Sequence, residues 1–166
     1  DRVYNTNIDG KIIELRQKVL DNKKLIYVGN MGFNYKMAGD DKENDISILK
    51  LNVPKLVDLP YFKGKLAKEE LINPGNFAYV VGYPRDLGKL ITQGIIASKD
   101  SKYLFSTATI NQGNSGGPLF LLDNGQPVLG GLSAVNLQGV NGVNGFVHVK
   151  DIRNLMKKSG LEDLLE

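Results

Sequence analysis

The 166 residues are enough for one domain or for two small, tightly joined barrels. The chain has no cysteine, which excludes disulfides, zinc–thiolate sites and a cysteine nucleophile. The net charge is only +3 and the lysines are scattered, not gathered with aromatic residues, so no nucleic-acid partner is expected. No apolar run approaches the ~20 residues of a membrane span, and no signal peptide is evident.

Strand patterns dominate the chain. Short apolar or alternating runs occur at residues 24–29, 45–51, 77–82, 90–97, 103–107, 119–122, 128–135 and 145–149. Gly94, inside the fourth run, indicates a bulge or a bend. Asp123-Asn124-Gly125 is typical of a hairpin turn between the sixth and seventh runs.

Two segments have helical spacing. Residues 12–20 fit a helix or a strand equally well. Residues 151–158 predict a helix, with an acidic start and a lysine-rich end that suit the helix dipole, and Gly160 ends it. Regularly spaced strands with one terminal helix predict an all-β fold, either a barrel or a sandwich.

The clearest chemical signal is the hexapeptide Gly113-Asn114-Ser115-Gly116-Gly117-Pro118. Glycines on both sides of Ser115 leave room for a substrate carbonyl and permit the backbone angles of a tight loop. Such a loop aims two backbone N–H groups at one point, where they stabilise an oxyanion beside the serine hydroxyl. A Ser-Gly-Gly triplet alone is usually an ordinary turn, so the longer motif carries the inference.

The hexapeptide resembles the nucleophile loop of trypsin-like serine proteases, and most of all the cysteine-free HtrA-type branch. Further matches follow in the family's order, from Asp45 to about Lys158, with weak similarity before Asp45. They include residues 45–50, 73–84, 92–98, 130–136 and 142–149. The resemblance implies a chymotrypsin-like pair of antiparallel barrels, the first incomplete, and a closing helix.

By that resemblance, the expected divisions are a partial N-terminal barrel (1–60), a linker (61–75), a C-terminal barrel (76–150) and a helix with tail (151–166). It also implies the site. Ser115 is the nucleophile, Asp45 is the orienting carboxylate of the catalytic triad, and the N–H groups of Gly113 and Ser115 form the oxyanion hole. Without the resemblance, Asp45 is an ordinary strand-initiating surface residue. Asn114 replaces the aspartate of the digestive enzymes, so activation by a newly cut N-terminus is not expected.

The general base is missing from this pattern. The family's histidine precedes the aspartate, whereas the only histidine here, His148, follows the serine. Because the chain begins at Asp1 and not at methionine, we expect a cut N-terminus with the histidine upstream of it. The alternative is a pseudoprotease that binds peptides without cleaving them.

An α/β-hydrolase is the rival enzyme class, because Gly113-x-Ser115-x-Gly117 also fits a nucleophile elbow. Ser115, Asp123 and His148 even follow that family's chain order. An elbow must lead into a helix, however, and Pro118 leads into a strand pattern. His148 is therefore expected to be an ordinary strand residue.

The resemblance further implies a peptide or unfolded protein as substrate, no cofactor or metal, and a homo-oligomer in some members. An HtrA-like protein would belong to the bacterial cell envelope or the extracellular space. The substrate pocket would be lined by uncharged residues, which predicts small or aliphatic substrate side chains. Those residues are Thr109, Ile110, Ser133, Ala134, Val135 and Gly145.

Overall fold

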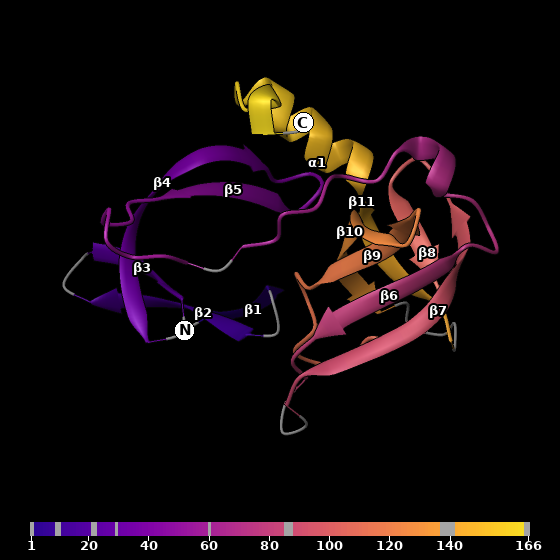
Figure 1. Ribbon diagram of the computed structural model, residues 1–166, viewed down its shortest axis with the longest axis horizontal. Coiled ribbons are helices and arrows are strands. Elements are labelled where there is room, and N and C mark those ends of the chain that lie inside the picture. The colour runs from indigo at the N-terminus through magenta and orange to yellow at the C-terminus, as the bar shows by residue number, and fades with distance from the viewer. Residues whose placement is uncertain are drawn as a thin grey trace.

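The computed structural model describes residues 2–8, 11–20, 23–28, 30–59, 61–84, 88–136 and 142–164; up to residue 24, and at 135 and 136, it describes the backbone only. Two groups of strands lie side by side, with a helix above them (Figure 1). The first group is an antiparallel sheet of five strands in chain order. It comprises β1 (Arg2–Ile8), β2 (Lys11–Leu20), β3 (Lys23–Val28), β4 (Met31–Asp41) and β5 (Ile46–Leu51).

The second group is a closed six-stranded barrel in the order β10-β11-β8-β7-β6-β9. Its strands are β6 (Phe77–Gly82), β7 (Leu90–Lys99), β8 (Tyr103–Ser106), β9 (Pro118–Asp123), β10 (Gln126–Asn136) and β11 (Asn144–His148). The helix α1 (Val149–Lys158) follows, with 3-10 turns η1 (Glu69–Leu71) and η2 (Glu162–Leu164). The predicted all-β class, the incomplete first barrel and the terminal helix are confirmed, whereas the proposed division at residues 60, 75 and 150 stays a prediction.

The ambiguous segment at residues 12–20 is a strand. It lies within β2, which pairs with β1 on one side and with β3 on the other. Two-sided pairing satisfies the backbone groups that a helix would have bonded internally, so tertiary context decides between two equal local patterns.

Gly94 does not mark a bulge, which is one of the two features expected there. Pairing of β7 with β6 runs through Gly94 without a shift, and the irregularity toward β8 falls between Ile96 and Ser98. Glycine is needed at position 94 for a different reason: a Cβ there would overlap the backbone of Thr107 and Ala108. Close approach of two backbones is the other common reason for a glycine inside a strand.

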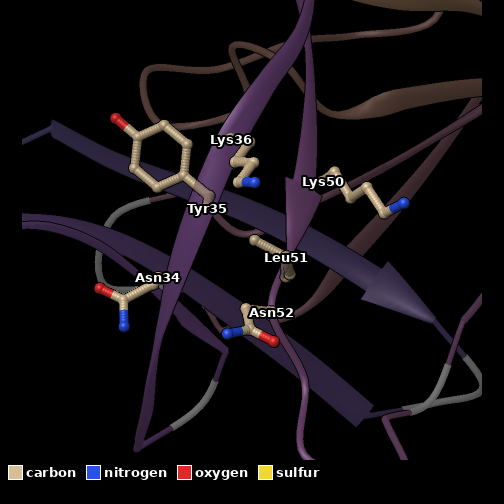
Figure 2. Close-up of a pocket in the computed structure, with 6 residues that line it drawn as sticks. All are labelled: Asn34, Tyr35, Lys36, Lys50, Leu51 and Asn52. Carbon is tan, nitrogen blue, oxygen red and sulfur yellow. The ribbon is translucent and has the colours of Figure 1, made fainter.

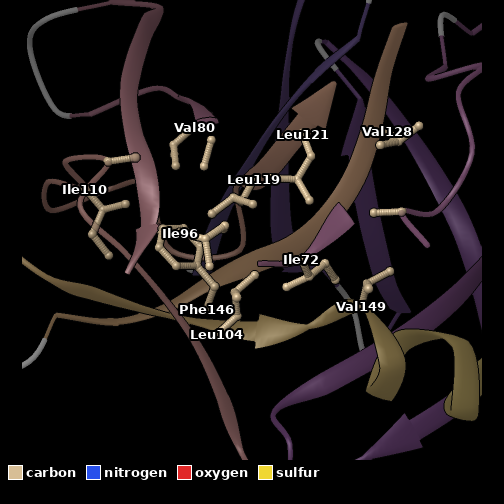
Figure 3. Close-up of a cluster of buried hydrophobic side chains, with 13 residues drawn as sticks. Ile72, Val80, Ile96, Leu104, Ile110, Leu119, Leu121, Val128, Phe146 and Val149 are labelled. Atoms are coloured by element: carbon tan, nitrogen blue, oxygen red, sulfur yellow. The ribbon is translucent and has the colours of Figure 1, made fainter. Parts of the chain in front are cut away.

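A buried apolar cluster fills the barrel (Figure 3). Ile72, Ile96, Leu104, Leu119 and Phe146 are all fully buried. Ile72 comes from the segment between the two groups of strands, so that segment is anchored in the barrel core. The adjoining parallel bridge between Leu66 and Leu129 holds the same segment against β10.

Helix α1 packs against both groups of strands, and it lies above them in Figure 1. Ile152 and Leu155 are buried together with Ile46 of β5 and Val147 of β11. On the sheet side, Gly39 of β4 lies directly beneath Leu155 and Ser159, leaving no room for a larger residue. The helix therefore joins the five-stranded sheet to the barrel through one shared apolar cluster.

Candidate active site

The loop that carries Ser115 connects β8 to β9 and is fixed by short backbone hydrogen bonds. Gly116 N–H donates to the Ser133 carbonyl over 2.7 Å, and Ser133 N–H donates to the Gly117 carbonyl over 2.8 Å. Within the loop, Gly117 N–H donates to the Asn114 carbonyl over 2.8 Å. Gly113 and Gly116 have φ values of 104° and 80°, in the left-handed region that glycine adopts without strain. The loop is therefore pinned to β10 in one conformation.

Ser115 lies at the exposed tip of this loop, so its hydroxyl is open to solvent. In the described part of the chain, neither the Gly113 N–H nor the Ser115 N–H donates to an acceptor, whereas the N–H groups of Asn114, Gly116 and Gly117 all do. Two uncommitted donors beside a serine hydroxyl are the groups that an oxyanion hole requires.

The buried side chain of Asn114 holds the Ser115 loop against β6. Only 2 % of Asn114 is exposed, and its side chain packs directly against the backbone of Gly82, the last residue of β6. Its N–H also donates to the Asn111 carbonyl over 3.0 Å. The Asn114 Oδ1 atom is buried without a hydrogen-bond partner among the described residues. The contact is therefore one of packing, because the Asn114 side chain fills the space that a side chain at position 82 would occupy.

Asp45 stands at the end of the turn between β4 and β5, with an unusual positive φ of 55°. The turn is stabilised by Asp41, which accepts from the backbone N–H of Asn44 at 3.2 Å and from Asn44 Nδ2 at 2.9 Å. These hydrogen bonds lower the pKa of Asp41. Asp45 itself is exposed, and among the described side chains it makes no hydrogen bond or ion pair. The structure gives no direct contact between Asp45 and Ser115.

His148 is the last residue of β11 and the N-cap of α1. Its Nδ1 accepts from the Lys150 N–H over 3.1 Å, and its Nε2 lies 3.8 Å from Glu69 Oε2. Only 1 % of the residue is exposed. Both ring nitrogens are therefore engaged inside the fold, and His148 cannot take a proton from Ser115. The capping role was not predicted, although a strand followed by an acidic first helical turn is a usable sequence signal for it.

The residues predicted to line a substrate pocket occupy different surroundings. Thr109 is exposed, Ile110 is 8 % exposed within the barrel core, and Ala134 packs against the cluster beneath α1. The backbone of Ser133 forms hydrogen bonds to the Ser115 loop, while its Oγ is buried without a described partner. Gly145 lies on β11 and pairs with Val135, whose side chain is outside the described residues. Their common role in a substrate pocket stays a prediction.

A pocket of about 360 Å³ lies elsewhere, on β4 and β5 (Figure 2). Asn34, Lys36, Lys50 and Asn52 line it together with Tyr35 and Leu51. It does not include any residue of the Ser115 loop, and in Figure 2 the two lysine side chains extend in different directions. No group of three or more histidine, aspartate or glutamate residues that could hold a metal occurs in the described ranges. Their helices also include none long and apolar enough to cross a membrane.

Comparison with known proteins identifies the family. The trypsin-like peptidase domain matches residues 10–130, well over half of the chain. The chain belongs to the trypsin-like peptidase family. The match begins at residue 10, ahead of Asp45, where the sequence by itself showed only weak similarity.

Individual relatives of this trypsin-like chain are HtrA-type proteins. It is 30 % identical over 169 residues to a probable periplasmic serine endoprotease DegP-like of Chlamydia trachomatis, covering 95 % of this chain and 32 % of the relative. It is 31 % identical over 117 residues to the periplasmic serine endoprotease DegP of Escherichia coli K12, covering 63 % of this chain and 24 % of the relative. The chain thus spans about a third or less of the length of these relatives.

Solved structures show the same fold. The serine endoprotease from Yersinia pestis superposes with a TM-score of 0.66 at 22 % identity, covering 97 % of this chain and 62 % of that one. The HtrA-type protease AlgW with decapeptide superposes with a TM-score of 0.64 at 21 % identity, covering 88 % and 47 %. The predicted relationship to the HtrA-type branch is confirmed.

Proposed function

We propose that this chain is part of an HtrA-type serine endopeptidase in which Ser115 is the nucleophile. The observation that carries the proposal is the Ser115 loop: an exposed hydroxyl beside two uncommitted N–H groups, on a backbone pinned to β10. Membership of the trypsin-like peptidase family supports the same reaction class.

In the proposed reaction, Ser115 Oγ attacks the carbonyl carbon of a peptide bond while a base removes its proton. The N–H groups of Gly113 and Ser115 hold the resulting oxyanion. The amine leaves with the proton from the base, and an acyl-serine remains, which water then hydrolyses. Asp45 orients the base and stabilises its charged form.

The proposal places the general base outside these 166 residues. His148 is the only histidine, and both of its nitrogens face partners within the fold. The same engagement argues against the α/β-hydrolase reading, which required His148 as the base.

A second candidate is a peptide-binding module without catalysis, because the only histidine of the 166 residues is the buried His148. A solved HtrA-type neighbour is described with a bound decapeptide. A cleft that keeps its peptide contacts while lacking a base would still bind peptides.

Fluorophosphonate labelling of the natural full-length protein separates the two candidates. An activated serine is expected to label quantitatively within minutes, with the label on the peptide containing Ser115, whereas Ser115→Ala should remain unlabelled. Asp45→Asn is expected to slow labelling strongly because the base would lose its orienting carboxylate. Absence of labelling, with the protein still folded, would contradict the endopeptidase and support the peptide-binding module.

The predicted pocket residues are uncharged, so we infer that the primary pocket takes small or aliphatic side chains. Profiling the full-length protein against a peptide library, and sequencing the products, measures this directly. Valine, alanine or leucine are expected before the cleaved bond. A preference for lysine or arginine there would overturn the inference.

The relatives are named periplasmic serine endoproteases, which supports a cell-envelope setting and a peptide or protein substrate. The HtrA resemblance implies that this substrate is unfolded. We propose a homo-oligomer as well, as the HtrA resemblance implies. Sedimentation of the full-length protein would test assembly independently of activity.

A further inference from the structure

Helix α1 packs against both groups of strands, and the side chain of His148 caps its first turn. Ile152 and Leu155 bury their apolar groups against both β5 and β11. Arg153 Nη2 donates to the Ala67 carbonyl over 2.9 Å, so the helix also holds the segment that joins the five-stranded sheet to the barrel. The start of the helix is capped by His148 through Lys150 N–H.

The cap at His148 works only while Nδ1 is unprotonated. A hydrogen-bond acceptor at the N-cap satisfies one of the otherwise unpaired N–H groups of the first turn. A protonated imidazole has a donor at both nitrogens, so the Lys150 N–H would lose its acceptor. The new positive charge would also lie at the positive end of the helix dipole.

The surroundings of His148 oppose protonation on balance. Burial lowers the pKa of His148, Lys150 of α1 and Lys99 of β7 lower it further, and Glu69 of η1 and Asp151 of α1 raise it. The effect of burial on the pKa of His148 outweighs that of the two carboxylates, because His148 is almost wholly enclosed. The side chain of Glu69, in contrast, is 49 % exposed, and its charge is screened by water.

We propose that His148 is an acid-sensitive latch, whose protonation in mildly acidic solution breaks the cap of α1 and loosens the contact between the five-stranded sheet and the barrel. The sheet carries Asp45, and the barrel carries Ser115. Acid would therefore alter how the two residues face each other. The latch does not depend on Ser115 being a nucleophile, since it is a property of the packing around α1.

The pH window follows from the direction of the shift. Because the pKa of His148 is lowered in the folded state, the unfolded chain binds this proton more readily. The contribution of His148 to the free energy of unfolding is therefore fully present above pH 6.5, its ordinary pKa. That contribution is lost as the pH falls from 6.5 toward the folded-state pKa.

Asp151, in the first turn of α1, acts in the opposite direction at lower pH. Its Oδ2 is buried without a described partner, and burial raises the pKa of this carboxyl above 3.8. The folded state therefore holds this proton more tightly, so acidification through the raised pKa toward 3.8 stabilises the fold. The effect of His148 is therefore best measured close below pH 6.5, before this compensation sets in.

Thermal unfolding between pH 7.5 and 5.5 tests the latch. The wild-type chain is expected to lose up to about 3–5 °C in Tm per pH unit below 6.5, which corresponds to one proton in a chain of this size. His148→Asn should remove that dependence, because asparagine caps a helix equally well and does not titrate. Glu69→Gln should extend the loss of Tm to lower pH without moving its onset, since Glu69 raises the pKa of His148 in the folded state only.

A distance measurement tests whether the two groups of strands separate. The chain has no cysteine, so spin labels at the exposed positions Lys42→Cys and Gln126→Cys attach uniquely. One narrow distance distribution is expected at pH 7.5, and a broader one at a second, acidic pH at which His148 is protonated in the folded chain. The distribution should stay narrow at both pH values when His148→Asn is added. Equal broadening in that variant, or an unchanged wild-type distribution, would overturn the proposal.

Discussion

The 166 residues alone are expected to release no measurable fragments from an unfolded protein such as casein. Removing the histidine of a serine protease triad lowers kcat on the order of a millionfold, as measured for subtilisin. The only histidine here is buried at the cap of α1 and engaged at both nitrogens. Fluorescent casein digestion over several hours, with mass spectrometry of the products, measures the rate.

Ser115→Ala is the matched control for this experiment. The variant removes one exposed oxygen and leaves the backbone bonds of the loop in place, so it should fold like the parent. The parent and Ser115→Ala are expected to give the same background rate of casein digestion. Hydrolysis by the parent that Ser115→Ala abolishes would show that another group within these residues takes the proton.

The sequence predicted the barrel strands and α1 because their apolar patterns are strong and their ends are marked by turn residues. It missed β1 and β4 for a physical reason. In β4, Asn34, Lys36 and Asp40 are exposed, and its apolar Met37 is 54 % exposed, so the strand has little apolar periodicity of its own. Pairing with β3 and β5 makes it a strand.

Some features of the candidate site could likewise be predicted from the sequence, and others could not. Ser115 could be found from its neighbours, because the glycines that a nucleophile loop needs are local in sequence. The contact between His148 and Glu69 and the contact between Gly82 and Asn114 could not be found in this way, since each joins residues that only the tertiary structure brings together. The role of Asp45 is still a prediction, because the geometry shows no contact between it and Ser115.

Gly82→Ala is expected to lower the free energy of unfolding by about 1–3 kcal/mol, the usual cost of adding a methyl group to a well-packed interior. Gly82 has no positive φ, so alanine would not strain its backbone. The cost arises from its Cβ, which would overlap the side chain of Asn114. Urea unfolding followed by circular dichroism gives the free energy of each variant.

The double variant with Asn114→Ala decides whether this overlap is the cause. Removing the Asn114 side chain opens the space that the new methyl group needs, and Asn114 Oδ1 has no described hydrogen bond to lose. The double variant should therefore be more stable than the sum of the two single effects predicts, by at least about 1 kcal/mol. Additive effects, within about 0.5 kcal/mol, would mean that the two residues do not interact. Coupling would instead show that the end of β6 directly supports the Ser115 loop, and that packing as well as hydrogen bonding holds the N–H groups proposed for the oxyanion hole.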